Sequence, residues 1–313
     1  MKKVLFSMVG HVLLLLASSH VMTSAGWAQR NNWRSPTDLI RPIKPLNVKP
    51  AKNPAASIPA YRVPQGTSSD PVAVYLMAGQ SNLVGAAVLS EAEPAEISPF
   101  EAVQIWSDRR GFISLVPGFN ERYVYFGPEH SFGRRIVARQ REQIYLITVG
   151  LGSTNLTEDW HPEGVNNWHD RLTSTVSVAL AELTAQNIAY EIEGLVWMQG
   201  ESDVWNAAFA AAYEQNLAQL IADMRHRYGD DLTVAIGLIR GDLPARDPAP
   251  LPIVRAAQRA VAAADERVVL VETDALGEGD VVLRTDAVHY NAVGQLRLGA
   301  AFGEAFETAP TDE

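Results

Sequence analysis

The chain has 313 residues, of which 47% are hydrophobic, so it can bury the core of one large domain or of two small ones. Its formal net charge is -10, and this acidity argues against nucleic acid or an anionic membrane surface as a partner. It contains no cysteine, which excludes a cysteine nucleophile and a thiolate metal site.

Residues 1–28 have the three parts of a secretory signal peptide. The chain begins Met-Lys-Lys, continues with an apolar segment from Val4 to Ala17 and then reaches small residues. Cleavage after Ala25 and cleavage after Ala28 fit equally well. An uncleaved membrane anchor is the alternative, but the apolar segment is short for a bilayer span. Removal takes away two lysines and no acid, which changes the charge from -10 to -12 in a secreted or periplasmic protein.

Residues 29–70 are rich in proline, asparagine, arginine and serine. Proline at this density does not fit the interior of helices or central strands, so we predict a tether or an arm that lies on a surface. The pattern changes at Pro71. Residues 71–307 are predicted to form a single domain, followed by a short tail over residues 308–313.

From Pro71 onward, short apolar runs alternate with amphipathic patterns. Runs typical of buried strands cover Val72–Ala78, Ile144–Val149, Leu195–Met198, Leu232–Ile239 and Val268–Val271. Apolar residues at three-to-four spacing predict helices over Leu172–Ala185, Ala207–Arg227, Ile253–Ala264 and Ala292–Phe306. This alternation predicts a three-layer α/β/α sandwich with a parallel sheet of about five strands. In such sheets the ligand crevice lies beyond the carboxyl ends of the strands.

The first apolar run ends in Gly79-Gln80-Ser81-Asn82. A strand that stops at a glycine and turns at once projects the serine from the sheet edge, with a backbone N–H facing the same space. Acyl transfer needs both features, a hydroxyl that attacks and a donor for the oxyanion. A lone Gly-x-Ser is more often an ordinary turn or a helix cap, so the assignment of Ser81 as a nucleophile depends on the motifs that follow.

A base and an acid occur together in Asp286-Ala-Val-His289, just before the last predicted helix. Imidazole can take the serine proton near neutral pH, and a carboxylate can hold the ring and stabilise its charged form. A spacing of three residues lets both side chains lie on one loop. Among the other histidines outside the signal peptide, His226 lies near a helix end, where a solvated role is more common. His130, His161 and His169 remain as competitors, and the last two can line the cleft.

Two further strand ends carry polar residues. The third apolar run ends in a segment that includes Gln199, Glu201 and Asp203. Gln199 can donate a side-chain N–H toward an oxyanion, while the two carboxylates can orient a base or bind sugar hydroxyls. The second run ends in Gly150-Leu-Gly152-Ser153, a glycine turn that can present another backbone donor. Ordinary strand-end turns are the alternative for both segments.

In this order, the motifs closely resemble the SGNH hydrolase superfamily. More narrowly, the chain is similar to the branch that holds sialate O-acetylesterase domains and carbohydrate esterase family six, which includes acetylxylan esterases. In that branch the nucleophile lies in Gly-Gln-Ser-Asn and the third block reads Gln-Gly-Glu, and both occur here unaltered. The terminal Asp-x-Val-His-Tyr also matches, and the resemblance covers residues 71–307.

The resemblance implies an SGNH-type fold and a serine carboxylic-ester hydrolase without a metal or organic cofactor. It makes Ser81 the nucleophile, His289 the base and Asp286 the acid. It also implies an oxyanion hole made by the N–H groups of Ser81 and Gly152 and by the side chain of Gln199. Glu201 remains a rival for the acid, because its strand ends in the same cleft. Further candidates for supporting or substrate-binding roles are Gln80, Asn82, Glu201, Trp160, His161, Trp168 and His169.

The expected reaction removes acetyl groups from a carbohydrate hydroxyl. The resemblance points to this reaction, and so do Trp160, Trp168 and Trp205, because indole faces can cover pyranose rings. The alternative for each tryptophan is that it anchors a loop on the core. Two other functions remain open: a catalytically inactive carbohydrate-binding protein, and an esterase that acts on a lipid or a thioester. The sequence does not identify the sugar, the linkage or the oligomeric state.

Overall fold

The computed structural model describes residues 70–119, 124–140, 142–277 and 282–309. The expected signal peptide, the proline-rich arm before Asp70 and the last four residues of the expected tail lie outside the described residues. No helix among the described residues is long and apolar enough to span a membrane.

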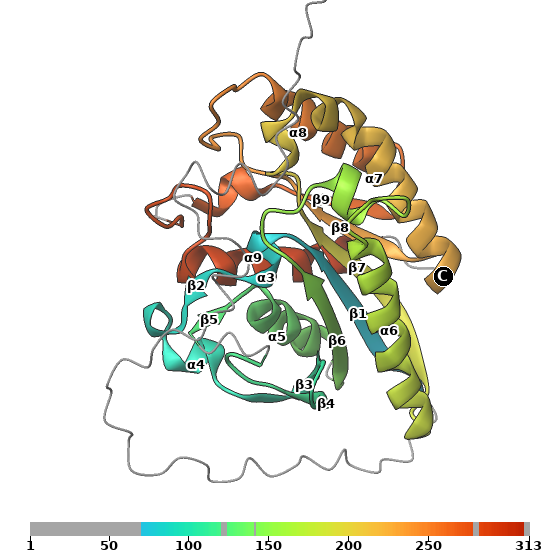
Figure 1. The fold of residues 1–313 in the computed structure, drawn as a ribbon. Helices are drawn as coiled ribbons and strands as arrows, with labels where there is room; N and C mark the ends of the chain where they lie inside the picture. Colours follow the sequence, from blue (N-terminus) through green and yellow to red (C-terminus); the bar gives the residue numbers. More distant parts are fainter. Residues whose placement is uncertain (1–69, 120–123, 141, 278–281, 310–313) are drawn as a thin grey trace, which may run out of the picture. The chain divides into compact units, whose positions relative to one another are not determined.

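A seven-stranded sheet has the order β4-β3-β6-β1-β7-β8-β9 (Figure 1). Its strands are β1 (Val72–Gly79), β3 (Phe100–Ser107), β4 (Gly111–Leu115), β6 (Ile144–Gly150), β7 (Tyr190–Met198), β8 (Thr233–Gly237) and β9 (Val268–Val271). Neighbouring strands pair in parallel, except that β4 is antiparallel to β3. A separate antiparallel pair is formed by β2 (Ala87–Val88) and β5 (Tyr125–Phe126).

Helices cover both faces of the large sheet (Figure 1). One face is covered by α6 (Trp168–Ala185), α7 (Ala207–Tyr228) and α8 (Pro250–Ala263), and the other by α5 (Glu129–Gln140) and α9 (Ala292–Thr308). The shorter helical segments are α3 (Ser81–Val84), α4 (Pro94–Ile97), η1 (Leu89–Glu91), η2 (Leu156–Trp160), η3 (Asp203–Trp205) and η4 (Thr273–Gly277). The predicted three-layer α/β/α sandwich is therefore confirmed.

The central strand β1 shows why its sequence lacks polar alternation. Successive side chains of a strand point to opposite faces. Val74 and Leu76 pack in the layer of α6, α7 and α8, whereas Tyr75 and Met77 pack in the layer of α5 and α9. Because both faces are buried, an uninterrupted apolar run is the expected pattern.

The sheet is larger than the predicted set of about five strands. All five predicted strands occur, and β3 and β4 extend the sheet beyond β6. The additional strands were not recognisable as continuous apolar runs, because β4 is an edge strand with mostly half-buried residues and β3 carries Glu101 and Gln104. The four predicted helices also occur, each with one end or both shifted by a few residues.

The register of the sheet brings three strand ends together. Gly79 of β1 pairs with Gly150 of β6 on one side and with Met198 of β7 on the other. The segments that follow these strands therefore leave the same edge of the sheet, at its centre. Gly79 has a φ of 151°, and a Cβ there would lie 2.0 Å from the carbonyl oxygen of Met198, so this close approach requires glycine.

Candidate active site

Ser81 is the first residue of α3, immediately after the end of β1. The turn before it is fixed by backbone hydrogen bonds. The N–H of Gln80 donates to the Met198 carbonyl at 2.9 Å, and the N–H groups of Leu83 and Val84 donate to the Gln80 carbonyl at 2.9 Å. The Ser81 side chain projects from this turn, and its Oγ lies 3.0 Å from Nε2 of His289, which is a hydrogen-bond distance.

His289 is oriented by Asp286. Nδ1 of the ring lies 3.0 Å from Oδ2 of Asp286, while Oδ1 accepts the backbone N–H groups of Val288 and His289, both at 2.9 Å. Partial burial pushes the pKa of Asp286 upward. The hydrogen bonds from His289 and Val288, together with the charge of His289, outweigh that effect and hold the pKa below its ordinary value. The carboxylate is therefore ionised at neutral pH and faces the ring.

A tight turn brings Asp286 and His289 to the same side of their loop. The N–H of Arg284 donates to the His289 carbonyl at 2.8 Å, and the N–H of Ala287 donates to the Arg284 carbonyl at 3.0 Å. Ala287 has a φ of 56°, in the left-handed region that residues with a Cβ seldom adopt. This bend lets the carboxylate of Asp286 reach the two N–H groups that follow it.

The segment after β6 lies directly against the serine. Leu151 donates its N–H to the Gly79 carbonyl at 3.2 Å. A Cβ added at Gly152 would lie 3.4 Å from Cβ of Ser81, so this glycine lies beside the turn that carries Ser81. Ser153 then turns the chain away with a φ of 62°.

Gln199 lies beside the same turn and is fully buried. Its Nε2 donates to the Thr154 carbonyl at 2.9 Å and to Oδ2 of Asp203 at 2.6 Å. The Tyr213 hydroxyl donates to the Gln199 backbone carbonyl at 2.8 Å and also lies 3.2 Å from Oε1 of Gln199. A side-chain amide has two N–H groups, so protein acceptors occupy both. The sequence could not reveal these partners, because Thr154 and Tyr213 belong to other elements.

Glu201 follows β7 and is only 3% exposed. Its Oε1 accepts Nδ2 of Asn82 at 2.7 Å. Burial raises the pKa of Glu201, and this increase is opposed by the hydrogen bond from Asn82 and by the charge of His289. Of the two candidate acids, Asp286 lies within hydrogen-bond distance of Nδ1 of His289. Glu201 binds the Asn82 side chain instead.

Two of the aromatic or imidazole candidates are not at a surface that a sugar could reach. Trp160 is 0% exposed, donates Nε1 to the Thr154 hydroxyl at 2.9 Å and packs edge-to-face on Trp197. His169 is 2% exposed and lies 2.7 Å from Asp223 of α7. Of the two roles predicted for Trp160 and His169, this burial does not fit contact with substrate, and the contacts of both side chains fit a supporting role that holds helices and loops on the core.

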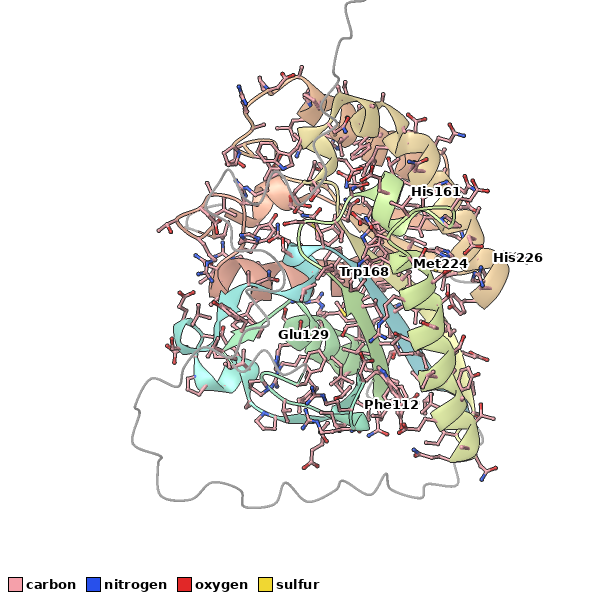
Figure 2. The ribbon with its side chains drawn as sticks, viewed as in Figure 1. Phe112, Glu129, His161, Trp168, Met224 and His226 are labelled. Carbon is pink, nitrogen blue, oxygen red and sulfur yellow. The ribbon has the colours of Figure 1, made fainter. Side chains whose placement is uncertain are left out.

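The other candidates keep partial exposure. His161 directly follows η2 and Trp168 is the first residue of α6 (Figure 2). Both side chains are half-buried. Trp205 of η3 is also half-buried. His130, a competitor for the base, is instead 0% exposed in α5, and burial lowers its pKa to about 4.

Sequence reasoning assigned no role to two glutamines that contact the site. Gln258 of α8 donates to the Gln199 carbonyl at 3.1 Å, and Gln295 of α9 donates to the Asn82 carbonyl at 3.1 Å. Both are fully buried. The available signal was a polar residue on the apolar face of a predicted helix. No cluster of three or more potential metal-ligand side chains occurs in the part of the chain that the structure describes.

Comparison with known proteins identifies a family. A family model described as carbohydrate esterase, sialic acid-specific acetylesterase, matches residues 71–308. No curated protein matches the chain.

Solved structures share the fold. A protein from Arabidopsis thaliana has a TM-score of 0.64 and 21% sequence identity, and the alignment covers 76% of this chain and 99% of that chain. NanS has a TM-score of 0.57 and 14% sequence identity, and the alignment covers 75% of this chain and 97% of NanS. A carbohydrate acetylesterase from Xanthomonas citri has a TM-score of 0.53 and 14% identity, with 74% and 55% covered.

Proposed function

Because the chain belongs to the sialic acid-specific acetylesterase family of carbohydrate esterases, we propose that it removes O-acetyl groups from a carbohydrate by a Ser-His-Asp mechanism. Family membership makes the protein a carboxylic-ester hydrolase. The observation that carries the mechanism is the hydrogen-bond chain from Ser81 through His289 to Asp286, with 3.0 Å at each step. A nucleophile, a base and an orienting acid in this relation are what serine acyl transfer requires.

The first half of the reaction transfers the acetyl group to the enzyme. Nε2 of His289 takes the Ser81 proton while Oγ attacks the ester carbonyl carbon. Asp286 stabilises the imidazolium that forms. When the tetrahedral intermediate collapses, the carbon–oxygen bond to the sugar breaks and His289 returns the proton to the sugar oxygen. The sugar alcohol leaves, and the acetyl group stays on Ser81.

The second half frees the enzyme. His289 takes a proton from water as the water oxygen attacks the acetyl carbonyl carbon. Breakdown of this intermediate releases acetic acid and returns the proton to Ser81. One ester and one water thus give one alcohol and one acid, and the enzyme ends in its starting state.

The negative oxygen of both intermediates needs donors. We assign these to the N–H groups of Ser81 and Gly152 and to Gln199. An oxyanion is a stronger acceptor than a neutral carbonyl, so we assign to it the Gln199 N–H that donates to the Thr154 carbonyl. Asp203 accepts the other N–H and fixes the plane of the amide.

We propose a sugar that carries an acetyl ester as the substrate. The similar structure from Xanthomonas citri is that of a carbohydrate acetylesterase, which supports acetyl as the acyl group. Trp168, Trp205 and His161 are half-buried and can contact a sugar ring and its hydroxyls. We also propose that the signal peptide exports the enzyme to where glycans occur, and a net charge of -12 after cleavage, from -10 with two lysines removed, does not repel a neutral glycan.

An acetate-release screen tests this function. Wild type and Ser81→Ala are incubated with acetylated xylan, acetylated sialic acid and acetylated monosaccharides, and free acetate is quantified. We expect wild type to release acetate from at least one of them and Ser81→Ala from none. If wild type released no acetate from any carbohydrate but hydrolysed 4-nitrophenyl octanoate, the substrate class would instead be lipid.

A further inference from the structure

Asn82, the residue after the serine, holds the chain on both sides of His289. Its Oδ1 accepts the N–H of Tyr290 at 3.2 Å, and its Nδ2 donates to the Val288 carbonyl at 3.1 Å. These two backbone groups bracket His289 in the chain. The Asn82 amide thus donates to the carbonyl before His289 and accepts from the N–H after it, as the backbone of a neighbouring strand does in a sheet. This pair of hydrogen bonds fixes the position of the His289 backbone.

Glu201 determines which way the amide of Asn82 faces. Nδ2 also donates to Oε1 of Glu201 at 2.7 Å, the shortest hydrogen bond of this side chain. If the amide were rotated, its oxygen would face the Glu201 oxygen and the Val288 carbonyl, which are both acceptors. One carboxylate therefore selects the orientation that binds the His289 loop.

Asn82 also binds the helix that follows the His289 loop. Gln295, in the first turns of α9, donates Nε2 to the backbone carbonyl of Asn82 at 3.1 Å. Asn82 is 1% exposed, Glu201 3% and Gln295 0%. Because these side chains are buried, they act on the reaction through His289 and not by touching the substrate.

We propose that Asn82 and Glu201 form a positioning pair that keeps Nε2 of His289 within hydrogen-bond distance of Ser81. The inference rests on the proposed function, since it concerns the same base. A displacement of about 1 Å at a reacting group can cost roughly 10²-fold in rate, so a buried hydrogen-bond clamp on the loop has a kinetic effect that its distance from the substrate would not suggest.

The role assigned to Glu201 is that of a hydrogen-bond acceptor. The competing role, an acid whose charge assists His289, is separated by two substitutions. Glu201→Gln removes the charge and retains an oxygen that can accept from Asn82, whereas Glu201→Ala removes both. The positioning role predicts that the first variant keeps most activity and the second loses it. A role for the charge predicts that both lose activity.

The experiment measures kcat and KM for 4-nitrophenyl acetate. We expect Asn82→Ala to lower kcat about 100-fold and Glu201→Ala about 10-fold, with KM within about 2-fold of wild type, because ground-state binding is untouched. Glu201→Gln should stay within about 3-fold of wild type. In a His289→Ala background, Asn82→Ala should have no further effect on the residual rate, because the pair acts only through His289.

Asn206→Ala is the matched control. Asn206 caps α7 by accepting the N–H groups of Ala208 and Phe209. Its removal costs these capping hydrogen bonds, so we expect a lower melting temperature with wild-type kcat. If Asn82→Ala behaved like this control, the proposal would be overturned. Equal losses in Glu201→Gln and Glu201→Ala would overturn it as well, and this comparison decides the matter if Asn82→Ala does not fold.

Ser81→Ala, assayed beside these variants, separates this inference from the proposed function. An active Ser81→Ala would remove the proposed mechanism itself. An inactive Ser81→Ala together with an unimpaired Asn82→Ala would leave that mechanism in place and refute only the positioning pair.

Discussion

Ser81 and His289 are 208 positions apart in the chain, yet Oγ and Nε2 lie 3.0 Å apart. Asp286 was favoured over Glu201 in the sequence because it is three residues from the histidine. The structure adds a physical reason, since Asp286 lies 3.0 Å from Nδ1 while Glu201 Oε1 accepts from Asn82. The two carboxylates thus have different partners and should have different consequences when neutralised.

Asp286→Asn should lower kcat more than Glu201→Gln does, by about 10-fold or more, because an acid on Nδ1 fixes the tautomer that leaves Nε2 free to accept the serine proton. Both substitutions are nearly isosteric, so each serves as the size control for the other. Initial rates with 4-nitrophenyl acetate compare them. A larger loss in Glu201→Gln would transfer the acid role to Glu201.

Gln199→Ala should lower kcat with little change in KM. An oxyanion donor acts on charge that exists only during the reaction, and losing one such donor costs about 10²–10³ in kcat in other hydrolases. Gln199 also binds Asp203 and Tyr213, so the melting temperature of the same sample is recorded to account for lost stability. A variant altered mainly in KM would reassign this side chain to sugar recognition.

At the scale of elements, the turn that carries Asp286 and His289, the proposed acid and base, contains one unusual backbone conformation. Ala287 adopts a φ of 56° between Asp286 and Val288. We expect Ala287→Gly to keep kcat, since glycine enters this region freely, and Ala287→Val to lose it, since β-branched residues are outliers there. Circular dichroism and kcat for the two variants check this. Equal activity in both would show that the turn does not set the geometry of the site.

The sequence was most informative about the polar motifs that directly follow buried strands. The ends of β1, β6 and β7 could be predicted to meet, because the carboxyl ends of parallel strands lie at one edge of a sheet. The strands β3 and β4 and the helix α5 could not be recognised, because their apolar residues cover only part of each element. Their presence widens the sheet without moving the site.

Burial of individual side chains was the least predictable property of the site. Trp160 follows the Gly152 segment closely in sequence, but tertiary packing places it against Trp197 with no exposure. The hydrogen bonds of the Gln199 amide were equally unpredictable, because its partner Thr154 follows a different strand. Local sequence indicates that such residues gather in one region. Which of them face the solvent is decided by packing between elements.

At the scale of the whole molecule, a buried acid near the site couples stability to pH. Burial raises the pKa of Asp203 to about 7, although hydrogen bonds from Gln199 and Leu156 oppose the increase. An unfolded chain releases this proton near pH 4, about the ordinary value of an aspartic acid. Between these two values the folded state binds more protons than the unfolded state, so this group makes the free energy of unfolding fall as pH rises.

Asp203→Asn should remove that contribution. We expect the melting temperature of wild type, relative to the variant, to decrease as pH rises through the window between the ordinary aspartic acid value and about 7. Thermal melts of both proteins across this window measure the difference. Parallel pH profiles for the two proteins would show that Asp203 does not titrate in this way.

The central claim, that this carbohydrate esterase works through an acetyl group on Ser81, can be tested by one measurement. Wild type is quenched with acid during turnover of 4-nitrophenyl acetate, and its peptides are analysed by mass spectrometry, with Ser81→Ala treated in the same way. We expect the peptide containing Ser81 to carry one acetyl group in wild type, and we expect Ser81→Ala to be neither acetylated nor active. An acetyl group trapped on another residue, or full turnover by Ser81→Ala, would contradict it.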